Sequence, residues 1–189
     1  MEAFANTALL VGLGEMGDKT QLLALLLAVR YQRSLPILGG IFIATLLTMA
    51  ITAAVGSTIA AFLPPSLLRW VLVAMFFAIA VWTLIPEGNE NEEDVPVRST
   101  HGLMLTAFIT FVVAELGDKS QIATLVMAAR YGEIAPVLAG ATLGEMIAIS
   151  PAVLLGKTTA QWIPMQWIRM AAAALFAALG LWVLVFGLG

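Results

Sequence analysis

The chain has 189 residues, of which 61% are hydrophobic and only 11% charged, with a mean hydropathy of +0.98 and a net charge of −3. Soluble domains carry about a quarter charged residues, so this composition excludes a soluble fold and predicts a small polytopic membrane protein. The absence of cysteine excludes disulfides and thiolate metal sites. A single histidine excludes a histidine cluster for zinc or copper, and no basic patch indicates binding to nucleic acid.

Hydropathy divides the chain into six apolar stretches, each long enough for a transmembrane helix of about 20 residues. In chain order they cover about 4–29, 35–62, 67–86, 103–129, 134–156 and 166–188. The N-terminus lacks the positive stretch of a secretory signal, so we expect the first stretch to be a mature helix. Residues 87–102 form a polar, acidic linker, a composition typical of a solvated loop.

The two halves of the chain repeat each other at a shift of 100 positions without a gap. The shift pairs charged residues as well as prolines and glycines: Glu15 with Glu115, Asp18 with Asp118, Lys19 with Lys119, Arg30 with Arg130, Pro36 with Pro136 and Gly40 with Gly140. Each unit holds three apolar stretches, and an odd number of spans inverts the second unit relative to the first. We therefore predict an all-α integral membrane protein of six transmembrane helices. Its parts are a first three-helix repeat (1–86), a cytoplasmic acidic linker (87–102) and an inverted repeat (103–189). Secondary transporters commonly have this architecture, with their sites where the repeats meet.

Arginine and lysine in the loops predict the orientation in the membrane, because cytoplasmic loops carry the excess of both. One side receives five of them and the other side two: Arg30, Arg33, Arg98, Lys157 and Arg169 against Arg69 and Arg130. The first side is expected to be cytoplasmic, which places both termini outside.

Five acidic residues and two lysines lie inside the apolar stretches: Glu15, Asp18, Glu115, Asp118, Glu145, Lys19 and Lys119. A charge at the bilayer centre costs about 3 kcal/mol or more, so such residues are candidates for function. Helix positions three and four apart share a face, which groups the first three charges of each repeat into one polar cluster. Gly17 and Gly117 permit close helix approach or a local break that frees backbone carbonyls.

Two such clusters facing each other would present four carboxylates, a ligand set preferred by Ca²⁺, Mg²⁺ and Mn²⁺. The predicted metal ligands are Glu15, Asp18, Glu115 and Asp118. The supporting residues are Lys19, Thr20, Gln21, Lys119, Ser120 and Gln121. Four carboxylates and two lysines leave a charge that one divalent cation or two protons would neutralise, which suggests the hypothesis of antiport. The alternative is structural, with each lysine paired to the glutamate four positions before it.

Glu145 has no acidic counterpart in the first repeat, where Thr45 occupies the matching position. It stands in a stretch of small residues suited to tight helix packing. Three roles stay open for it: a fifth ligand, a proton relay, or a neutral buried acid.

The two segments Glu15–Thr20 and Glu115–Ser120 both fit the pattern Glu-x-Gly-Asp-(Lys/Arg)-(Thr/Ser). In this doubled motif the chain resembles the Gdt-type cation/proton antiporters, which include Golgi and chloroplast calcium/manganese transporters and bacterial manganese exporters. The resemblance covers the whole chain. It implies a cation site made by the four motif acids, with Lys19, Thr20, Lys119 and Ser120 in support. The small size is similar to the bacterial members, which implies export of Mn²⁺ across the bacterial inner membrane.

Several alternatives stay open beside Mn²⁺/H⁺ antiport. One is a Ca²⁺/H⁺ antiporter of the same architecture, and another is a channel. From other classes come an intramembrane aspartyl protease, with Asp18 and Asp118 as its dyad, and an assembly factor for another membrane complex. In the leading interpretation the protein is not an enzyme and has no permanently bound cofactor. Its expected partners are a divalent metal ion as substrate, protons and the lipid bilayer, and a homo-oligomer is left open.

Overall fold

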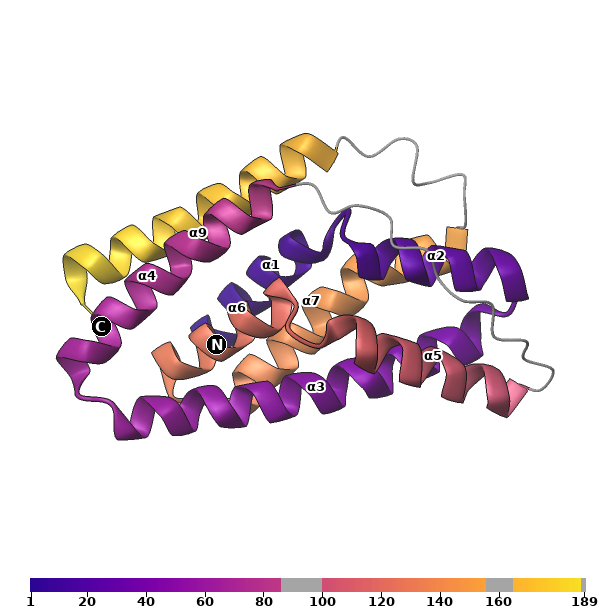
Figure 1. Ribbon diagram of the computed structural model, residues 1–189, viewed down its shortest axis with the longest axis horizontal. Helices are drawn as coiled ribbons and strands as arrows, with labels where there is room; N and C mark the ends of the chain where they lie inside the picture. Colours follow the sequence, from indigo (N-terminus) through magenta and orange to yellow (C-terminus); the bar gives the residue numbers. More distant parts are fainter. Residues whose placement is uncertain (86–99, 156–164, 188–189) are drawn as a thin grey trace.

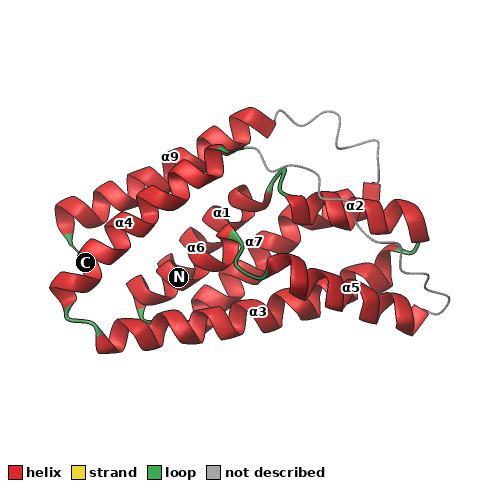
Figure 2. Ribbon diagram, viewed as in Figure 1, coloured by secondary structure: helices red, strands yellow, loops and turns green. Residues whose placement is uncertain are grey.

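The computed structural model describes residues 1–85, 100–155 and 165–187, and every regular element within them is an α-helix (Figures 1 and 2). The helices are α1 (Glu2–Glu15), α2 (Lys19–Tyr31), α3 (Ser34–Phe62), α4 (Pro65–Leu84), α5 (Thr100–Glu115), α6 (Lys119–Tyr131), α7 (Ile134–Leu155) and α9 (Met165–Phe186). The prediction of an all-α protein is therefore confirmed for these residues. Most of the acidic linker predicted over 87–102 lies outside the described residues.

The helix boundaries follow the repeat in the sequence. The elements correspond at the shift of 100 positions as α1 with α5, α2 with α6, α3 with α7 and α4 with α9, and α2 and α6 have the same bounds within their repeats. The first and fourth apolar stretches are each broken into two helices at the charged motif. Between α5 and α6 the chain bends by 71°.

The motif itself encodes this break. Gly17 and Gly117 have φ angles of 79° and 76°, a left-handed conformation that glycine adopts without steric cost. Asp18 and Asp118 then stand at the N-caps of α2 and α6, a position where aspartate is preferred because its carboxylate can accept from free backbone N–H groups. A helix end, a turn and a new helix start therefore fall within five residues, and the motif acids lie at that point.

The two halves are interlocked, because helices of one half pack closely against helices of the other. α1 packs along α7 and α5 packs along α3, while α4 lies beside α9 (Figure 1). Glycines make the first two pairs close: a Cβ on Gly40 would lie 2.3 Å from the Met104 carbonyl oxygen, and one on Gly140 would lie 2.4 Å from that of Phe4. Small residues at such crossings let two backbones approach in membrane proteins.

Among the described residues three helices, α3, α4 and α7, are long and apolar enough to cross a membrane, or four spans result if the bent pair α5–α6 counts as one. α3 also carries exposed large apolar side chains such as Phe42, Leu47 and Ile51. Exposed apolar surface of this kind is typical of a protein that contacts lipid. The structure thus supports a membrane protein, and six spans in two inverted repeats remain a prediction.

Candidate functional site

Three carboxylates from the two motifs converge at the centre of the molecule. One oxygen each of Glu15, Asp18 and Asp118 lies within 4.8 Å of the other two, and each of these residues is about 1% exposed. Glu15 ends α1, while Asp18 and Asp118 begin α2 and α6. Because both halves contribute, the group exists only when the repeats are packed together. We call these three residues the carboxylate group.

A lysine ion pair joins the carboxylate group across the halves. Lys119 Nζ lies 3.0 Å from Asp18 Oδ1, and Lys119 is only 5% exposed. The structural alternative pairs each lysine with a glutamate of its own helix, whereas this ion pair links α6 to the first repeat. Three carboxylates and one ammonium leave a formal charge of −2, which one divalent cation would neutralise.

Hydroxyl groups from both motifs complete the polar lining. Thr20 Oγ1 donates to Glu15 Oε2 over 2.5 Å, and Ser120 Oγ donates to Asp118 Oδ2 over 3.0 Å. Within the described residues the other oxygen, Asp118 Oδ1, is buried and has no hydrogen-bond partner. A buried carboxylate oxygen without a partner is costly, so it is available as a ligand for a cation.

Glu115, the fourth acid of the predicted ligand set, stands beside the carboxylate group but outside it. It is fully buried and accepts hydrogen bonds from Thr48 Oγ1 and, over 3.2 Å, from Thr45 Oγ1 of α3. Thr45 Oγ1 also contacts Glu145 Oε1 of α7 at 2.8 Å, and Glu145 is fully buried. The structure therefore places Glu115 with Glu145 and two threonines, and Glu145 lies close to the motif acids.

Thr45 and Thr48, which contact Glu115, were not predicted as site residues from the sequence. A signal for Thr45 was present, because it is the repeat counterpart of Glu145. Counterparts that lie where the two repeats meet can contact each other, as Thr45 and Glu145 do. Thr48 carries no comparable signal, since its counterpart is Ala148.

The side-chain oxygens of the motif glutamines accept hydrogen bonds from backbone N–H groups. Gln21 Oε1 accepts from the Gly17 N–H over 2.8 Å, and Gln121 Oε1 accepts from the Gly117 N–H over 3.2 Å. Gln21 also donates from Nε2 to the Ala148 carbonyl oxygen of α7 over 2.8 Å. Lys19 is half-buried, and in the described part of the chain no ion pair connects it to Asp118. The second lysine of the predicted set is therefore outside the carboxylate group.

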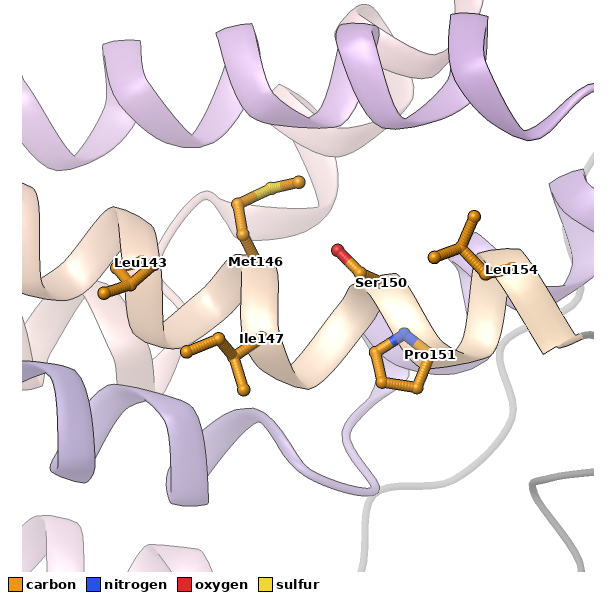
Figure 3. Close-up of a pocket in the computed structure, with 6 residues that line it drawn as sticks. All are labelled: Leu143, Met146, Ile147, Ser150, Pro151 and Leu154. Carbon is orange, nitrogen blue, oxygen red and sulfur yellow. The ribbon is translucent and has the colours of Figure 1, made fainter.

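A separate groove of about 550 Å³ follows one side of α7 (Figure 3). It is lined by Leu143, Met146, Ile147, Ser150, Pro151 and Leu154, all on the one helix and apolar except for the serine. Such a lining offers few ligands to a cation, so the groove is not part of the candidate site.

Comparisons with known proteins identify the family of this chain. The family model described as divalent cation/proton antiporter GDT1 matches residues 3–91 and 103–189. A candidate manganese exporter of Vibrio cholerae is 44% identical over 96% of this chain and 90% of its own length. A GDT1-like protein of Synechocystis is 30% identical, covering 93% of both chains, and GDT1-like protein 5 of Arabidopsis thaliana is 25% identical over 96% of this chain and 94% of its own. No solved structure matches. The doubled motif, the buried acids it brings together and these matches lead to one conclusion: the chain belongs to the GDT1 family of divalent cation/proton antiporters.

Proposed function

We propose that the protein exchanges a divalent cation for protons, with Mn²⁺ exported from the cytoplasm as the main substrate. The observation that carries the proposal is the convergence of Glu15, Asp18 and Asp118 from both repeats in a buried group of formal charge −2. Membership of the antiporter family supports exchange for protons. The similarity to the candidate manganese exporter of Vibrio cholerae supports Mn²⁺.

The carboxylate group would bind the cation, with Glu115 next to it as the fourth motif acid. Thr20 and Ser120 hold the Glu15 and Asp118 carboxylates in place through their hydroxyl donors. In the absence of a cation, Lys119 compensates part of the negative charge through Asp18. Carboxylates must be deprotonated to bind a metal, so metal and protons compete for the same oxygens, and this competition couples their movements.

The proposed architecture is six transmembrane spans in two inverted repeats, 1–86 and 103–189, joined by a cytoplasmic linker at 87–102. The interlocked packing of α1 with α7 and of α3 with α5 supports it, because the same contact recurs with the repeats exchanged. Inverted repeats allow a central site to open to one side and then to the other. In this proposal the chain is a transporter of the bacterial inner membrane, not an enzyme, and both termini lie outside.

Ca²⁺ is the second candidate substrate. The carboxylate and hydroxyl groups of the site are all hard oxygen ligands, which suit Ca²⁺ as well as Mn²⁺. The ratio of the two fluxes measured in the same vesicles would decide between them.

The test is flux of Mn²⁺ and Ca²⁺ into proteoliposomes under an imposed pH gradient. Loss of an outer-shell partner of a metal ligand costs about 10- to 100-fold, so removal of a ligand in Asp18→Asn or Asp118→Asn should reduce gradient-driven flux at least as much. The matched control is Glu133→Gln, which neutralises an exposed acid and should transport as the unmodified chain does. Undiminished flux in both aspartate variants would contradict the proposal, and flux that ignores the gradient would indicate a channel.

A further inference from the structure

We propose that Glu115, Glu145, Thr45 and Thr48 form a second subsite for a divalent cation, adjacent to the carboxylate group. This inference rests on the proposed function, since it concerns the path of the same ion. The four residues come from three helices: Glu115 ends α5, Thr45 and Thr48 are on α3, and Glu145 is on α7. All four are buried, with exposures between 0% and 6%.

The hydrogen bonds show how closely these oxygens are gathered. Thr45 Oγ1 lies 2.8 Å from Glu145 Oε1 and 3.2 Å from Glu115 Oε1, and Thr48 Oγ1 bonds to Glu115 Oε2. The subsite therefore offers two carboxylates and two hydroxyls. Oxygen ligands of this kind bind Mg²⁺, Ca²⁺ and Mn²⁺ in proteins.

The donors available to these carboxylates are too few. A threonine hydroxyl has one hydrogen, yet Thr45 faces two carboxylates, and Thr48 Oγ1 also lies 3.0 Å from the Ala44 carbonyl oxygen. Glu145 Oε2 is buried and has no hydrogen-bond partner among the described residues. This orphaned oxygen is the independent sign of a ligand, because burying it without a partner is costly.

The ion pairs of the described residues leave the charge of this subsite without a basic partner. Within the part of the chain that the structure describes, no ion pair reaches Glu115 or Glu145, whereas Lys119 pairs with Asp18 in the carboxylate group. Two buried carboxylates without a counter-charge are unfavourable. One divalent cation would neutralise them, just as one would neutralise the carboxylate group with its lysine.

The position of the subsite suits a path for the ion. Glu115 and Asp118 belong to the same helix break, where the Asp118 N–H donates to the Glu115 carbonyl oxygen over 3.0 Å. The proposal therefore places the subsite beside the carboxylate group on the path of the ion. The repeat does not duplicate this arrangement, because Thr45 and Thr48 of the first half correspond to Glu145 and Ala148 of the second.

Counting bound Mn²⁺ by equilibrium dialysis of the full chain in detergent tests the subsite without requiring transport. At saturating Mn²⁺ we expect two ions per chain, and one in Glu145→Gln, which keeps the side-chain shape but removes the charge. Asp18→Asn should also retain one ion, the double variant none, and the exposed-acid control Glu133→Gln two.

A second variant distinguishes the loss of a binding group from a folding defect. Thr48→Val replaces the hydroxyl by a methyl group of similar size, and loss of such a supporting group should weaken the second binding step by about tenfold or more. A cooperative melting transition is the check on folding, with a fall in stability of about 1 kcal/mol expected from the lost hydrogen bond. The subsite would be overturned if the unmodified protein and Glu145→Gln each bound one Mn²⁺ per chain, with Mn²⁺ affinities that agree within about twofold. The same result is expected if Glu115 and Glu145 only share a proton. Two bound ions without gradient-driven flux would instead reject the proposed function and keep the subsite.

Discussion

The segments 15–21 and 115–121 have almost the same sequence and the same backbone but different surroundings. Both break a helix at a glycine of positive φ and place an aspartate at the N-cap position of the next helix, where the Asp118 carboxylate accepts from the Ser120 N–H. In the second segment Lys119 is buried against Asp18, and Leu116 is 67% exposed at the turn. In the first segment Lys19 is half-buried, and Gln21 is bonded to α7.

The difference comes from the packing of the helices that follow the two breaks. α6 lies against α1, α3, α4 and α7, whereas α2 lies against α3, α5 and α7. A lysine at the start of α6 is therefore enclosed, while its counterpart at the start of α2 is closer to the surface. The motif therefore determines the local turn, and tertiary packing determines which of its charges meet.

Substitution of the two motif lysines should affect stability most, and unequally. Lys119→Met removes the partner of a buried carboxylate, a change that costs about 3 kcal/mol or more. Lys19→Met should cost well below that, because no ion pair joins Lys19 to Asp118 in the described part of the chain. Melting curves of both variants in the same detergent measure the contrast, and equal losses of stability would mean that the two lysines are equivalent.

The two halves are alike at the helix crossings, where Gly40 and Gly140 are counterparts. Gly40→Ala and Gly140→Ala both push a Cβ against a backbone carbonyl, and overpacking of this kind costs about 1–3 kcal/mol. Similar falls in melting temperature are expected for both.

Gly39→Ala is the matched control for the glycine variants, since its Cβ would meet only the flexible Met104 side chain at 3.6 Å. It should be neutral or slightly stabilising, because alanine is the better helix former. A loss as large as that of Gly40→Ala would show that the close approach is not the cause.

The smallest effect concerns the glutamines. Gln21→Leu removes hydrogen bonds to the Gly17 N–H and to the Ala148 carbonyl oxygen, whereas Gln121→Leu removes the longer bond to the Gly117 N–H. At about 1 kcal/mol for each bond, the first variant should lose about twice as much unfolding free energy as the second. Chemical denaturation of both variants would measure the ratio of the two losses. A greater loss for Gln121→Leu would contradict the larger contribution expected of Gln21.

Much of the fold could be predicted because its signals are local and repeated. Alternation of apolar stretches and breaks predicts helices, and charged residues repeating at 100 positions predict two related halves. Gly17 and Gly117 indicated close helix approach or a local break, and the break lies where α1 and α5 end, since the turn preference of glycine is local. From the sequence we predicted that two clusters, one from each repeat, face each other, and in the structure Asp18 and Asp118 lie in the same carboxylate group.

The arrangement within the cluster could not be predicted, because it depends on contacts between distant helices. The four motif acids were predicted as one ligand set, and the structure adds that Glu115 accepts hydrogen bonds from Thr45 and Thr48 next to the carboxylate group. The choice of Lys119 over Lys19 as the partner of Asp18 follows from how α6 packs. Neither contact leaves a pattern in the neighbouring sequence.

The central claim is that metal and protons compete for the buried carboxylates, and proton release on Mn²⁺ binding tests it most directly. Mn²⁺ added to the full chain in weakly buffered detergent solution should acidify the solution, and Mn²⁺ affinity should fall as the pH falls, because metal-binding carboxylates must be deprotonated. Asp118→Asn should release fewer protons, while Glu133→Gln should release as many as the unmodified chain. Mn²⁺ binding without proton release, with an affinity independent of pH, would contradict the account.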